Sequence, residues 1–387
     1  MTGATPTGEE LAEYRARARD WLATASIPEL PDDYDQRARA LRDWHGVLYE
    51  AGWVGIQWPA EVGGQGLSAH HQLAFSDELA RARAPQPAGA IGLEVVGPTL
   101  LKYGTDAQRE RFVRPLLSGE HVWCQCFSEP EAGSDLGSLR TRGVVTDDNI
   151  TITGHKIWTS WATDADWCAV LVRTDPDAPK HRGISYVLVD LRSPGVTVRP
   201  IVMLNGDAEF NEVFFEDVVV PRENVLGELH GGWKLAMDTL GWERGGYAIR
   251  RRIENEIVFS NVVDGLREGG AVSEVEAERV GSVYLSLRAF RALSHRTAQR
   301  LVDGDVPSPH DSVDKLILAT TEQDVMGLAF DLGGQRRLAA GSRPRGLSAD
   351  SVFRSFLYGR AATVYGGSAQ IQRTLIAERL LGMPRGR

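Results

Sequence analysis

The chain has 387 residues, of which 42% are hydrophobic and 25% charged, and its formal net charge is -9 with a pI of about 5.6. This balance is typical of a globular protein with two or three cores and argues against nucleic-acid binding over the whole surface. Because the sequence holds no run of about 18 apolar residues, and its start lacks an apolar stretch and carries acidic residues early, we expect neither a membrane span nor a signal peptide.

The first 120 residues predict a helical domain. Apolar residues recur there at helical spacing in several segments joined by irregular, often Gly-rich connections. The helical segments expected are 9–24, 36–52, 70–83 and 105–119. Thr105 is placed to cap the last of these helices.

Residues 121–229 predict a β domain. The stretch "VVTDDNITITG" sets polar turn residues between β-branched runs and indicates a hairpin. Short runs rich in Val, Ile and aromatic residues follow, separated by Gly, Pro and Asp, and they indicate an antiparallel barrel or sandwich. Residues 230–387 return to helical spacing and predict a four-helix-bundle-like domain. The fold class expected is therefore α+β, with domains at 1–120, 121–229 and 230–387.

The cysteine content is low. Cys124, Cys126 and Cys168 suggest a reducing compartment without a disulfide framework, and hence a cytoplasmic protein. Cys124 and Cys126 lie on one face of a predicted strand. A Cys-x-Cys pair can begin a metal site, but no matching Cys or His pair follows, so we interpret these residues as buried thiols and expect no metal.

Two polar stretches of the β domain suit a ligand. In "CFSEPEAGSDLGSLRT" the loop around Gly133 and Ser134 can wrap a heterocycle or phosphate at little steric cost. In "GHKIWTSWATDADW" Trp158 can lie flat against a large ring, and Ser160 can donate a hydrogen bond to the ring's edge. Taken singly, Trp158 is better interpreted as a core aromatic residue and Ser160 as a strand-end cap.

The stretch "YGGSAQIQRTLIAERLLG" near the C-terminus joins a glycine pair to a helix. Ser368 is a good N-cap, residues 369–381 contain no helix breaker, and Gly382 with Pro384 ends the helix. Glycines allow a close backbone approach, and a helix start offers unpaired N–H groups. An ordinary loop-to-helix turn is the alternative.

Together, and in this order, these motifs resemble those of the acyl-CoA dehydrogenase family. The resemblance covers nearly the whole chain and includes "FSEPEAGSD", "GHKIWTS", "ADW", "FFEDVVVP" and "YGGSAQIQRTLIAERLLG". It implies an N-terminal helical domain, a middle β domain and a C-terminal helical bundle. It also implies FAD as cofactor, an acyl-CoA substrate, an electron-transfer flavoprotein as acceptor, and a homo- or heterotetramer, α2β2 included.

The resemblance also implies roles for single residues. Those expected at FAD are Phe127, Ser128, Gly133, Trp158, Ser160, Ser368 and Gln370. Those expected at the substrate are Ser134, Arg244 and Tyr365. The backbone N–H of Gly366 would face the thioester carbonyl oxygen, an oxyanion-hole role that needs backbone rather than charge.

The chain departs from the family pattern at the base. Many members have "YEG" where this chain has Tyr365-Gly366-Gly367, and that Glu removes the α-proton. Without a base the chemistry should stall, because a thioester α-carbon is a weak acid. Glu243, at the margin of an apolar stripe and next to Arg244, resembles the mid-chain Glu-Arg pair of some branched-chain, long-chain and actinobacterial sterol side-chain members. We therefore predict Glu243 as the base; a structural salt bridge with an arginine is the alternative.

A second departure concerns the cofactor's adenine end. The family's "RxxFG" segment has no counterpart in "RRRIENEIVFSNVVDGLREGG", which suggests a partner subunit that completes the site or a different mode of FAD binding. Trp161 is bulky where relatives often have Asn or Gly. The predicted function is FAD-dependent dehydrogenation of an acyl-CoA thioester to the trans-2-enoyl-CoA, with a branched or sterol side-chain acyl group as one candidate substrate. The alternatives are a flavin oxidase or monooxygenase on the same fold and a non-catalytic subunit of a heteromeric dehydrogenase.

Overall fold

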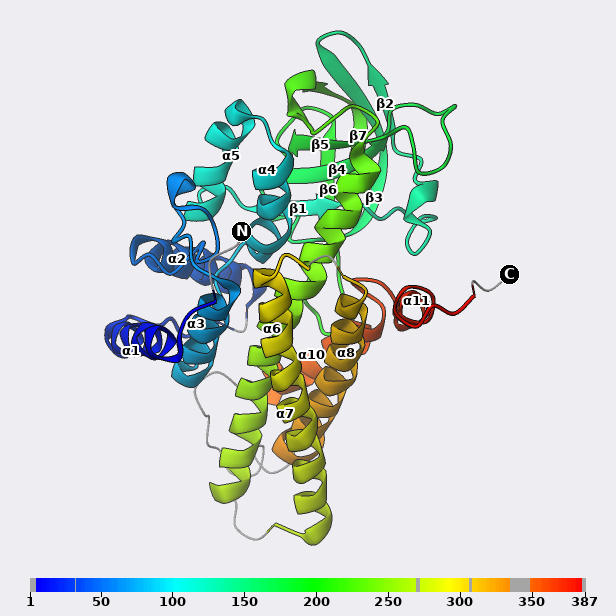
Figure 1. Ribbon diagram of the computed structural model, residues 1–387. Helices are drawn as coiled ribbons and strands as arrows, with labels where there is room; N and C mark the ends of the chain where they lie inside the picture. Colours follow the sequence, from blue (N-terminus) through cyan, green and yellow to red (C-terminus); the bar gives the residue numbers. More distant parts are fainter. Residues whose placement is uncertain (1–4, 32, 269–271, 306–307, 335–348, 385–387) are drawn as a thin grey trace. The chain divides into compact units, whose positions relative to one another are not determined.

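The computed structural model describes residues 5–31, 33–268, 272–305, 308–334 and 349–384; within them, the side chains of 243–250, 333–334 and 349–351 are not described. The chain folds into two compact units (Figure 1). Unit 1 comprises Met1–Trp44, Gly55–Gln86 and Arg244–Arg387, and unit 2 comprises His45–Val54 and Pro87–Glu243. Both units therefore combine segments that are distant in the sequence.

The helices expected in the first 120 residues are present. The α-helices of this part are α1 (Gly8–Thr24), α2 (Tyr34–Glu50), α3 (Ala69–Ala82), α4 (Gly97–Tyr103) and α5 (Asp106–Ser118). Shorter 3-10 or π turns are η1 (Ala60–Val62) and η2 (Gly92–Val96). The Thr105 cap is confirmed, since its hydroxyl accepts a hydrogen bond from the Gln108 N–H at 3.2 Å.

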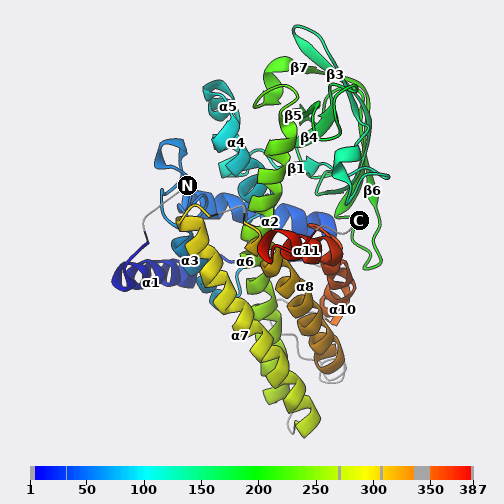
Figure 2. The ribbon, with the colours of Figure 1, turned by 45° about the vertical axis from the view of Figure 1, so that its right-hand side comes forward.

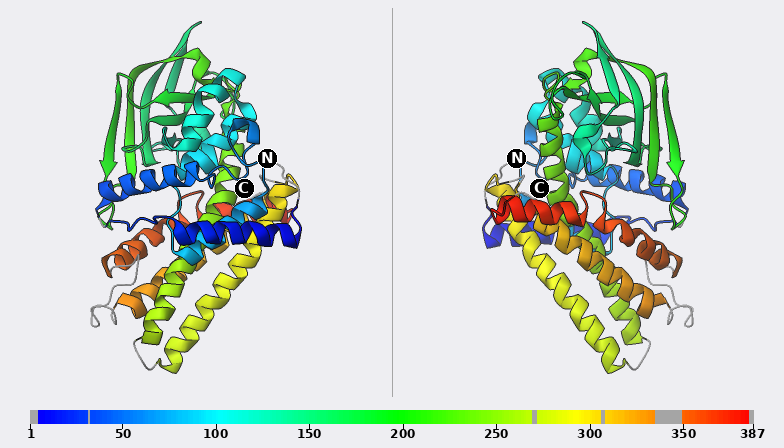
Figure 3. Two further views of the ribbon diagram at one scale, coloured as in Figure 1. Left: turned by 90° about the vertical axis from the view of Figure 1, so that its left-hand side faces the viewer. Right: turned by 90° about the vertical axis from the view of Figure 1, so that its right-hand side faces the viewer.

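Unit 2 is built on one sheet. Its strands are β1 (Trp123–Cys126), β2 (Arg142–Val145), β3 (Asn149–Ser160), β4 (Trp167–Arg173), β5 (Ile184–Asp190), β6 (Val196–Ile201), β7 (Phe210–Pro221) and β8 (Val225–Leu226), with turns η3 (Leu136–Ser138) and η4 (Arg222–Asn224). The strand order is β6-β7-β3-β2-β4-β5-β8, and β1 pairs with β4. The hairpin predicted from "VVTDDNITITG" is confirmed by the antiparallel pairing of β2 with β3. The long strands β3 and β7 run side by side as green ribbons in Figure 3.

The sheet is open, so the barrel alternative is wrong. Its end strands β6 and β8 pair with β7 and β5 and not with each other. The short strand β2 is where the sheet divides into two halves. It pairs with β3 along a ladder but with β4 through only one residue pair, Arg142↔Arg173. One core cluster takes side chains from β3 and β7 as well as from β4 and β5, so the sheet's two halves enclose a common core, as in a sandwich. Two parallel pairings, β1–β4 and β2–β4, depart from the antiparallel pattern expected.

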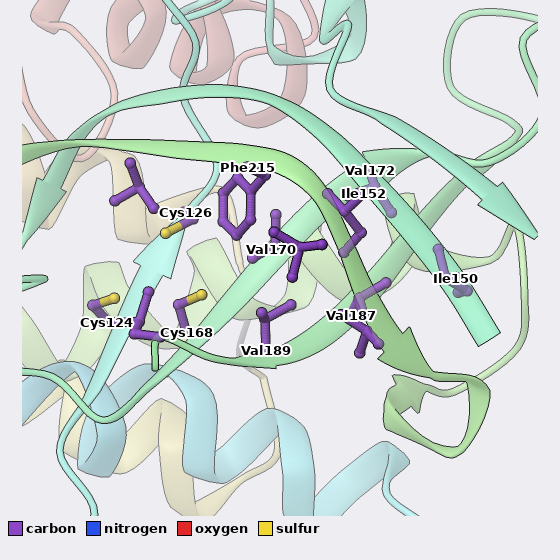
Figure 4. Packing of buried hydrophobic residues seen from close by; sticks show 14 of the residues in the cluster. Cys124, Cys126, Ile150, Ile152, Cys168, Val170, Val172, Val187, Val189 and Phe215 are labelled. Atoms are coloured by element: carbon purple, nitrogen blue, oxygen red, sulfur yellow. The ribbon is translucent and has the colours of Figure 1, made fainter. Parts of the chain in front are cut away.

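The three cysteines belong to this core. Cys124 and Cys168 are register partners on β1 and β4, and all three side chains are fully buried. Figure 4 shows their sulfur atoms gathered at one end of the cluster, next to Val189 and Phe215. Burial raises the pKa of Cys124 and Cys168, which keeps them as thiols. Although the sulfur atoms lie within 4.8 Å of one another, thiolates in this apolar setting would be strongly disfavoured. We interpret the cluster as core packing.

Unit 1 contains the helical bundle expected at the C-terminus. Its helices are α6 (Gly232–Glu268, which begins in unit 2), α7 (Glu274–Val302), α8 (His310–Leu328), α10 (Ala349–Tyr358) and α11 (Ala369–Leu375), with turns η5 (Ala329–Gly334), η6 (Gly359–Thr363) and η7 (Ile376–Leu380). One hydrophobic cluster takes buried residues from α6, α7, α8 and α10. Asp77 of α3 pairs with Arg252 and Arg291, which ties α3 to the bundle. Among the described helices, none combines the length and apolar character needed to cross a bilayer.

Candidate active site

Apart from Glu243 and Arg244 in α6, the predicted site residues fall into two groups, one in each unit. The first group lies on the segment from Phe127 to Thr141 and on the end of β3, both in unit 2. The second lies on the turn between η6 and α11, in unit 1. We call them the loop–bulge site (residues 127–141 and 156–161) and the C-terminal turn (residues 362–372).

The loop–bulge site begins where β1 ends. Phe127 is buried, and its ring meets the edge of Tyr186 at a centroid distance of 5.7 Å. Ser128 is half-buried, and its carbonyl accepts a hydrogen bond from the Ile157 N–H of β3 at 3.0 Å. Gly133 and Ser134 follow in an exposed turn. The loop therefore has an anchored start and an accessible polar tip.

A buried ion pair closes this loop at its base. The Glu129 carboxylate lies 2.8 Å from the Lys156 ammonium, and both side chains are buried. Burial alone would raise the pKa of Glu129, but the Lys156 charge and the hydrogen bonds from Thr141 and Arg140 outweigh it and lower the pKa. Burial also lowers the pKa of Lys156, and the Glu129 charge opposes that shift. Neither residue stood out in the sequence.

Trp158 is displayed outward by a β-bulge. The pairing of β3 with β7 shifts register between Lys156 and Thr159, and Trp158 lies in that irregularity with a φ of 60°. Its side chain is 58% exposed, so the interpretation of Trp158 as a core aromatic residue is wrong for the chain by itself. Ser160, at the end of β3, is half-buried. Trp161 also has a positive φ, of 64°, and its N–H donates to the Glu209 carbonyl at 2.8 Å.

The C-terminal turn is built on two glycines. Gly366 and Gly367 have φ values of 61° and 89°, a region in which glycine is far less strained than other residues. The buried Gln372 amide donates to both of their carbonyls, at 3.0 and 3.2 Å. Ser368 caps α11 as predicted, because its hydroxyl accepts from the Ile371 N–H at 3.3 Å. Gln370 is exposed, and the helix continues from α11 into η7, beside α8 in Figure 2.

Side chains of α8 fix the residue before the glycines. The buried Lys315 donates to the Ala362 carbonyl at 2.9 Å and lies 4.0 Å from the centre of the Tyr365 ring, a cation–π contact. The Tyr365 hydroxyl lies 3.5 Å from the buried Glu322 carboxylate. Glu322 in turn accepts two hydrogen bonds from Arg251. The peptide that joins Tyr365 to Gly366 is therefore flanked by anchored groups on both sides.

Comparison with family models matches the entire architecture. The model described as "Acyl-CoA dehydrogenase, N-terminal domain" matches residues 8–120, the middle domain matches 124–218, and the C-terminal domain matches 230–381. The chain belongs to the acyl-CoA dehydrogenase family. This family consists of flavoprotein oxidoreductases, and the chain is an acyl-CoA dehydrogenase by its full-length similarity to named members.

Several of the similar proteins come from actinobacteria. "Acyl-CoA dehydrogenase IpdE1" of Mycolicibacterium smegmatis is 38% identical over 97% of this chain and 98% of its own length. "Acyl-CoA dehydrogenase FadE34" of Mycobacterium tuberculosis is 40% identical over 98% of this chain and 50% of its own length. A solved structure titled "Tcur3481-Tcur3483 steroid ACAD" superimposes with a TM-score of 0.85 at 31% identity, covering 98% of this chain and 99% of that one.

The structure describes the two residues predicted to be catalytic to different extents. Gly366 lies in the C-terminal turn with the geometry given above. Glu243 and Arg244 lie within the backbone of α6, but their side chains are outside the described residues, so the base and its paired arginine stay predictions. The residues that sequence reasoning missed are supporting ones: Glu129, Lys156, Lys315, Glu322 and Gln372. Strict alternation along β3 from Ile150 could have identified Lys156 as inward-facing.

Proposed function

We propose that this acyl-CoA dehydrogenase catalyses the FAD-dependent α,β-dehydrogenation of an acyl-CoA thioester to the trans-2-enoyl-CoA. As substrate class we propose a branched or steroid-derived acyl group, since a relative of similar structure is titled a steroid ACAD. The observation that carries the proposal is the outward display of Trp158 beside Ser160, at the end of the strand that also anchors Ser128. Such an arrangement offers an aromatic face and hydroxyl groups to a flat polar ring system.

The residues of the loop–bulge site fit a flavin. The indole of Trp158 is exposed, the hydroxyl-bearing Ser128 and Ser160 are half-buried, and the turn at Gly133 and Ser134 is open. These side chains are uncharged, which suits the flavin ring, while Ser134 and the turn's backbone suit the polar part of coenzyme A. Bound FAD would supply the acceptor for the β-hydrogen, which leaves the substrate as hydride.

The chain's own residues would handle the proton and the carbonyl charge. Glu243 would take the α-proton at a carboxylate oxygen, and the Gly366 N–H would donate to the thioester oxygen as charge develops there. The fixed neighbours of Gly366 support this role, because Gln372 and the contacts of Tyr365 leave the turn little freedom to reorient. A donor held in advance needs no reorganisation during the reaction.

We further propose that a second kind of subunit completes the cofactor site, and that an electron-transfer flavoprotein in the cytoplasm accepts the electrons. Two arginines of the "RRRIENE" stretch are committed within unit 1: Arg251 to Glu322 and Glu254, and Arg252 to Asp77 and Glu256. A solved structure of 28% identity, with a TM-score of 0.81, is titled the ChsE4-ChsE5 complex from Mycobacterium tuberculosis. The alignment covers 99% of this chain and all of the matched chain in that complex. Two-chain assembly is therefore compatible with this fold.

Replacement of Glu243 by Gln tests the reaction. The protein, purified with any partner subunit encoded beside it, is mixed anaerobically with branched and steroid-derived acyl-CoA esters, and flavin absorbance is followed. We expect the unchanged protein to bleach, and Glu243→Gln to bind flavin but to bleach at least about a thousandfold more slowly, as is typical when an essential base is lost. Glu223→Gln, at a carboxylate that is 75% exposed, is the matched control and should bleach normally. Normal bleaching by Glu243→Gln would remove Glu243 from the mechanism.

Expression of the chain alone, and together with candidate partner chains, tests the assembly. We expect little flavin on the single chain and a stoichiometric complex with bound FAD on co-expression, measured by light scattering and the flavin-to-protein absorbance ratio. A yellow, active homotetramer of this chain alone would overturn the two-subunit proposal and leave the dehydrogenase proposal intact.

A further inference from the structure

The buried ion pair Glu129–Lys156 has no part in the proton and hydride steps, yet it lies at the base of the loop–bulge site. Lys156 is fully buried and Glu129 is 7% exposed, with 2.8 Å between the Nζ and Oε1 atoms. The two residues come from the two motifs "FSEPEAGSD" and "GHKIWTS"; the second lies on β3, the second strand of the β2–β3 hairpin. The pair therefore links the two segments that we propose to contact the flavin.

Glu129 holds the loop's two ends together. Its Oε2 atom accepts from the Arg140 N–H at 2.6 Å, and its Oε1 atom accepts from the Thr141 N–H at 2.8 Å. At the loop's start, Glu129 and Ala132 exchange two backbone hydrogen bonds of 3.1 Å. One carboxylate thus fixes where the loop leaves the sheet and where it returns.

Lys156 fixes the peptide groups at the start of the loop. Its ammonium donates to the Phe127 carbonyl at 3.1 Å, and the next residue, Ile157, donates its N–H to the Ser128 carbonyl at 3.0 Å. Both carbonyls therefore point toward β3. The orientation of the Phe127–Ser128 backbone is set by two consecutive residues of that strand.

Lys156 is also the last residue of regular β3–β7 pairing before the bulge. Pairing resumes at Thr159, which is buried and whose carbonyl accepts from the Asn211 Nδ2 group at 3.1 Å. Trp158 lies between these two anchors with a φ of 60°. A bulky residue with positive φ persists only where the surrounding structure determines it from several sides.

We propose that the Glu129–Lys156 pair is a positioning device that fixes Ser128 and Trp158 relative to each other. The inference rests on the proposed function, because it assigns the pair's purpose to the flavin site. Stability alone is a weak reason for such a pair, since apolar residues of similar volume often stabilise a core as well or better. The role of the pair is geometric. Its two side chains hold the ends of the loop, the Phe127–Ser128 backbone and the start of the bulge in one fixed arrangement.

The test compares Lys156→Met, Glu129→Gln and the double variant in the full chain with its partner subunit. The readouts are the affinity of the flavin-free protein for FAD, from flavin fluorescence quenching, and the visible circular dichroism of bound flavin. We expect each variant, including the uncharged double variant, to bind FAD about tenfold more weakly, a loss typical of removing a supporting residue around a ligand, and to change the dichroism. The matched control is Arg252→Met with Asp77→Asn, a buried ion pair of unit 1, which should leave the dichroism unchanged.

The outcomes separate this inference from the proposed function. If the double variant folds, binds FAD with unchanged affinity and keeps the dichroism, the positioning role is overturned. If Lys156→Met has no further effect in a Trp158→Phe background, the pair acts through Trp158, as inferred. If the unchanged protein binds no flavin with any partner, the proposed function fails before the pair is tested.

Discussion

The loop–bulge site and the C-terminal turn both hold backbone at positive φ, but in opposite ways. In the loop–bulge site the unusual φ falls on Trp158, whose side chain is the group to be displayed. In the C-terminal turn it falls on Gly366 and Gly367, where the backbone itself is the proposed donor. At Trp158 the side chain is needed, so the backbone keeps a strained φ. At Gly366 and Gly367 only backbone groups are needed, and glycine adopts a positive φ without that strain.

The supporting residues differ in the same sense. The bulge is flanked by a buried ion pair that contacts the backbone at Phe127, Arg140 and Thr141. The carbonyls of Gly366 and Gly367 are held by one neutral amide, that of Gln372. The buried charges are strong constraints but become costly when one partner is lost, whereas an amide is weaker and does not depend on pH. The comparison therefore predicts a larger response to mutation at the Glu129–Lys156 pair than at Gln372.

The largest effect is expected for Lys156→Met. Removal of the ammonium leaves the Glu129 carboxylate buried with only its backbone donors, and loss of one partner of a buried pair typically costs about 3–5 kcal/mol. The free energy of unfolding of unit 2, followed by tryptophan fluorescence in urea, should fall by about this amount. The double variant Glu129→Gln with Lys156→Met should recover much of the loss. A double variant less stable than Lys156→Met would contradict the charge argument.

Acid should act on the same pair. The pKa of Glu129 is lowered in the folded chain, so its contribution to stability is present above the usual carboxyl pKa and is lost as the pH falls through the folded value. The stability of unit 2 should thus decline below a pH of about 4.5 more steeply in the unchanged chain than in the double variant, by up to about 1.4 kcal/mol per pH unit. The free energy of unfolding is measured in urea between about pH 3 and 6. If it changes equally with pH in the unchanged chain and in the double variant, Glu129 is not ionised in the folded chain.

The order of elements could be read from the sequence because it depends on local patterns. Capping signals such as Thr105 and Ser368, hairpin turns and hydrophobic periodicity each involve residues close in the chain, and the structure confirms them. The open sheet was harder to predict, since closure depends on whether β6 meets β8, which no local pattern determines. The same holds for the compact units, where α3 joins the C-terminal helices through contacts such as Asp77 with Arg252.

At the candidate site, the motifs revealed the displayed residues but not their supports. Gly366 and Trp158 stood out by residue type, whereas Gln372 and Lys156 looked like ordinary members of a helix and a strand. Their roles depend on contacts with Gly366 and Gly367, and with Glu129, that only the folded chain displays. The bulge adds a further reason: strict alternation from Lys156 would turn Trp158 inward, and the register shift turns Thr159 inward instead.

A smaller effect is expected for Gln372→Leu. The change removes the donor for the Gly366 and Gly367 carbonyls, and two lost hydrogen bonds of about 0.5–1.5 kcal/mol each cost about 1–3 kcal/mol together. Amide hydrogen exchange of residues 362–368 should accelerate by roughly the corresponding factor of 5–150, while exchange in the loop–bulge site stays unchanged. Gln372→Glu, which keeps the size but places an acceptor against the carbonyls, should be at least as disruptive. Unchanged exchange in both variants would show that the turn is held by Lys315 and Tyr365 alone.

The smallest effects should distinguish the glycines of the two sites. At Gly367 a Cβ atom would lie 2.5 Å from the Gln372 Nε2 atom, and the φ of 89° disfavours any side chain, so Gly367→Ala should cost about 1–2 kcal/mol. At Gly133 a Cβ atom would meet nothing within 4 Å, so Gly133→Ala should change the free energy of unfolding by less than about 0.5 kcal/mol. Any larger effect of Gly133→Ala should therefore appear in ligand binding, measured as the affinity for FAD. If Gly133→Ala leaves both quantities unchanged, the loop tip does not approach the cofactor, and the freedom of glycine matters only at the C-terminal turn.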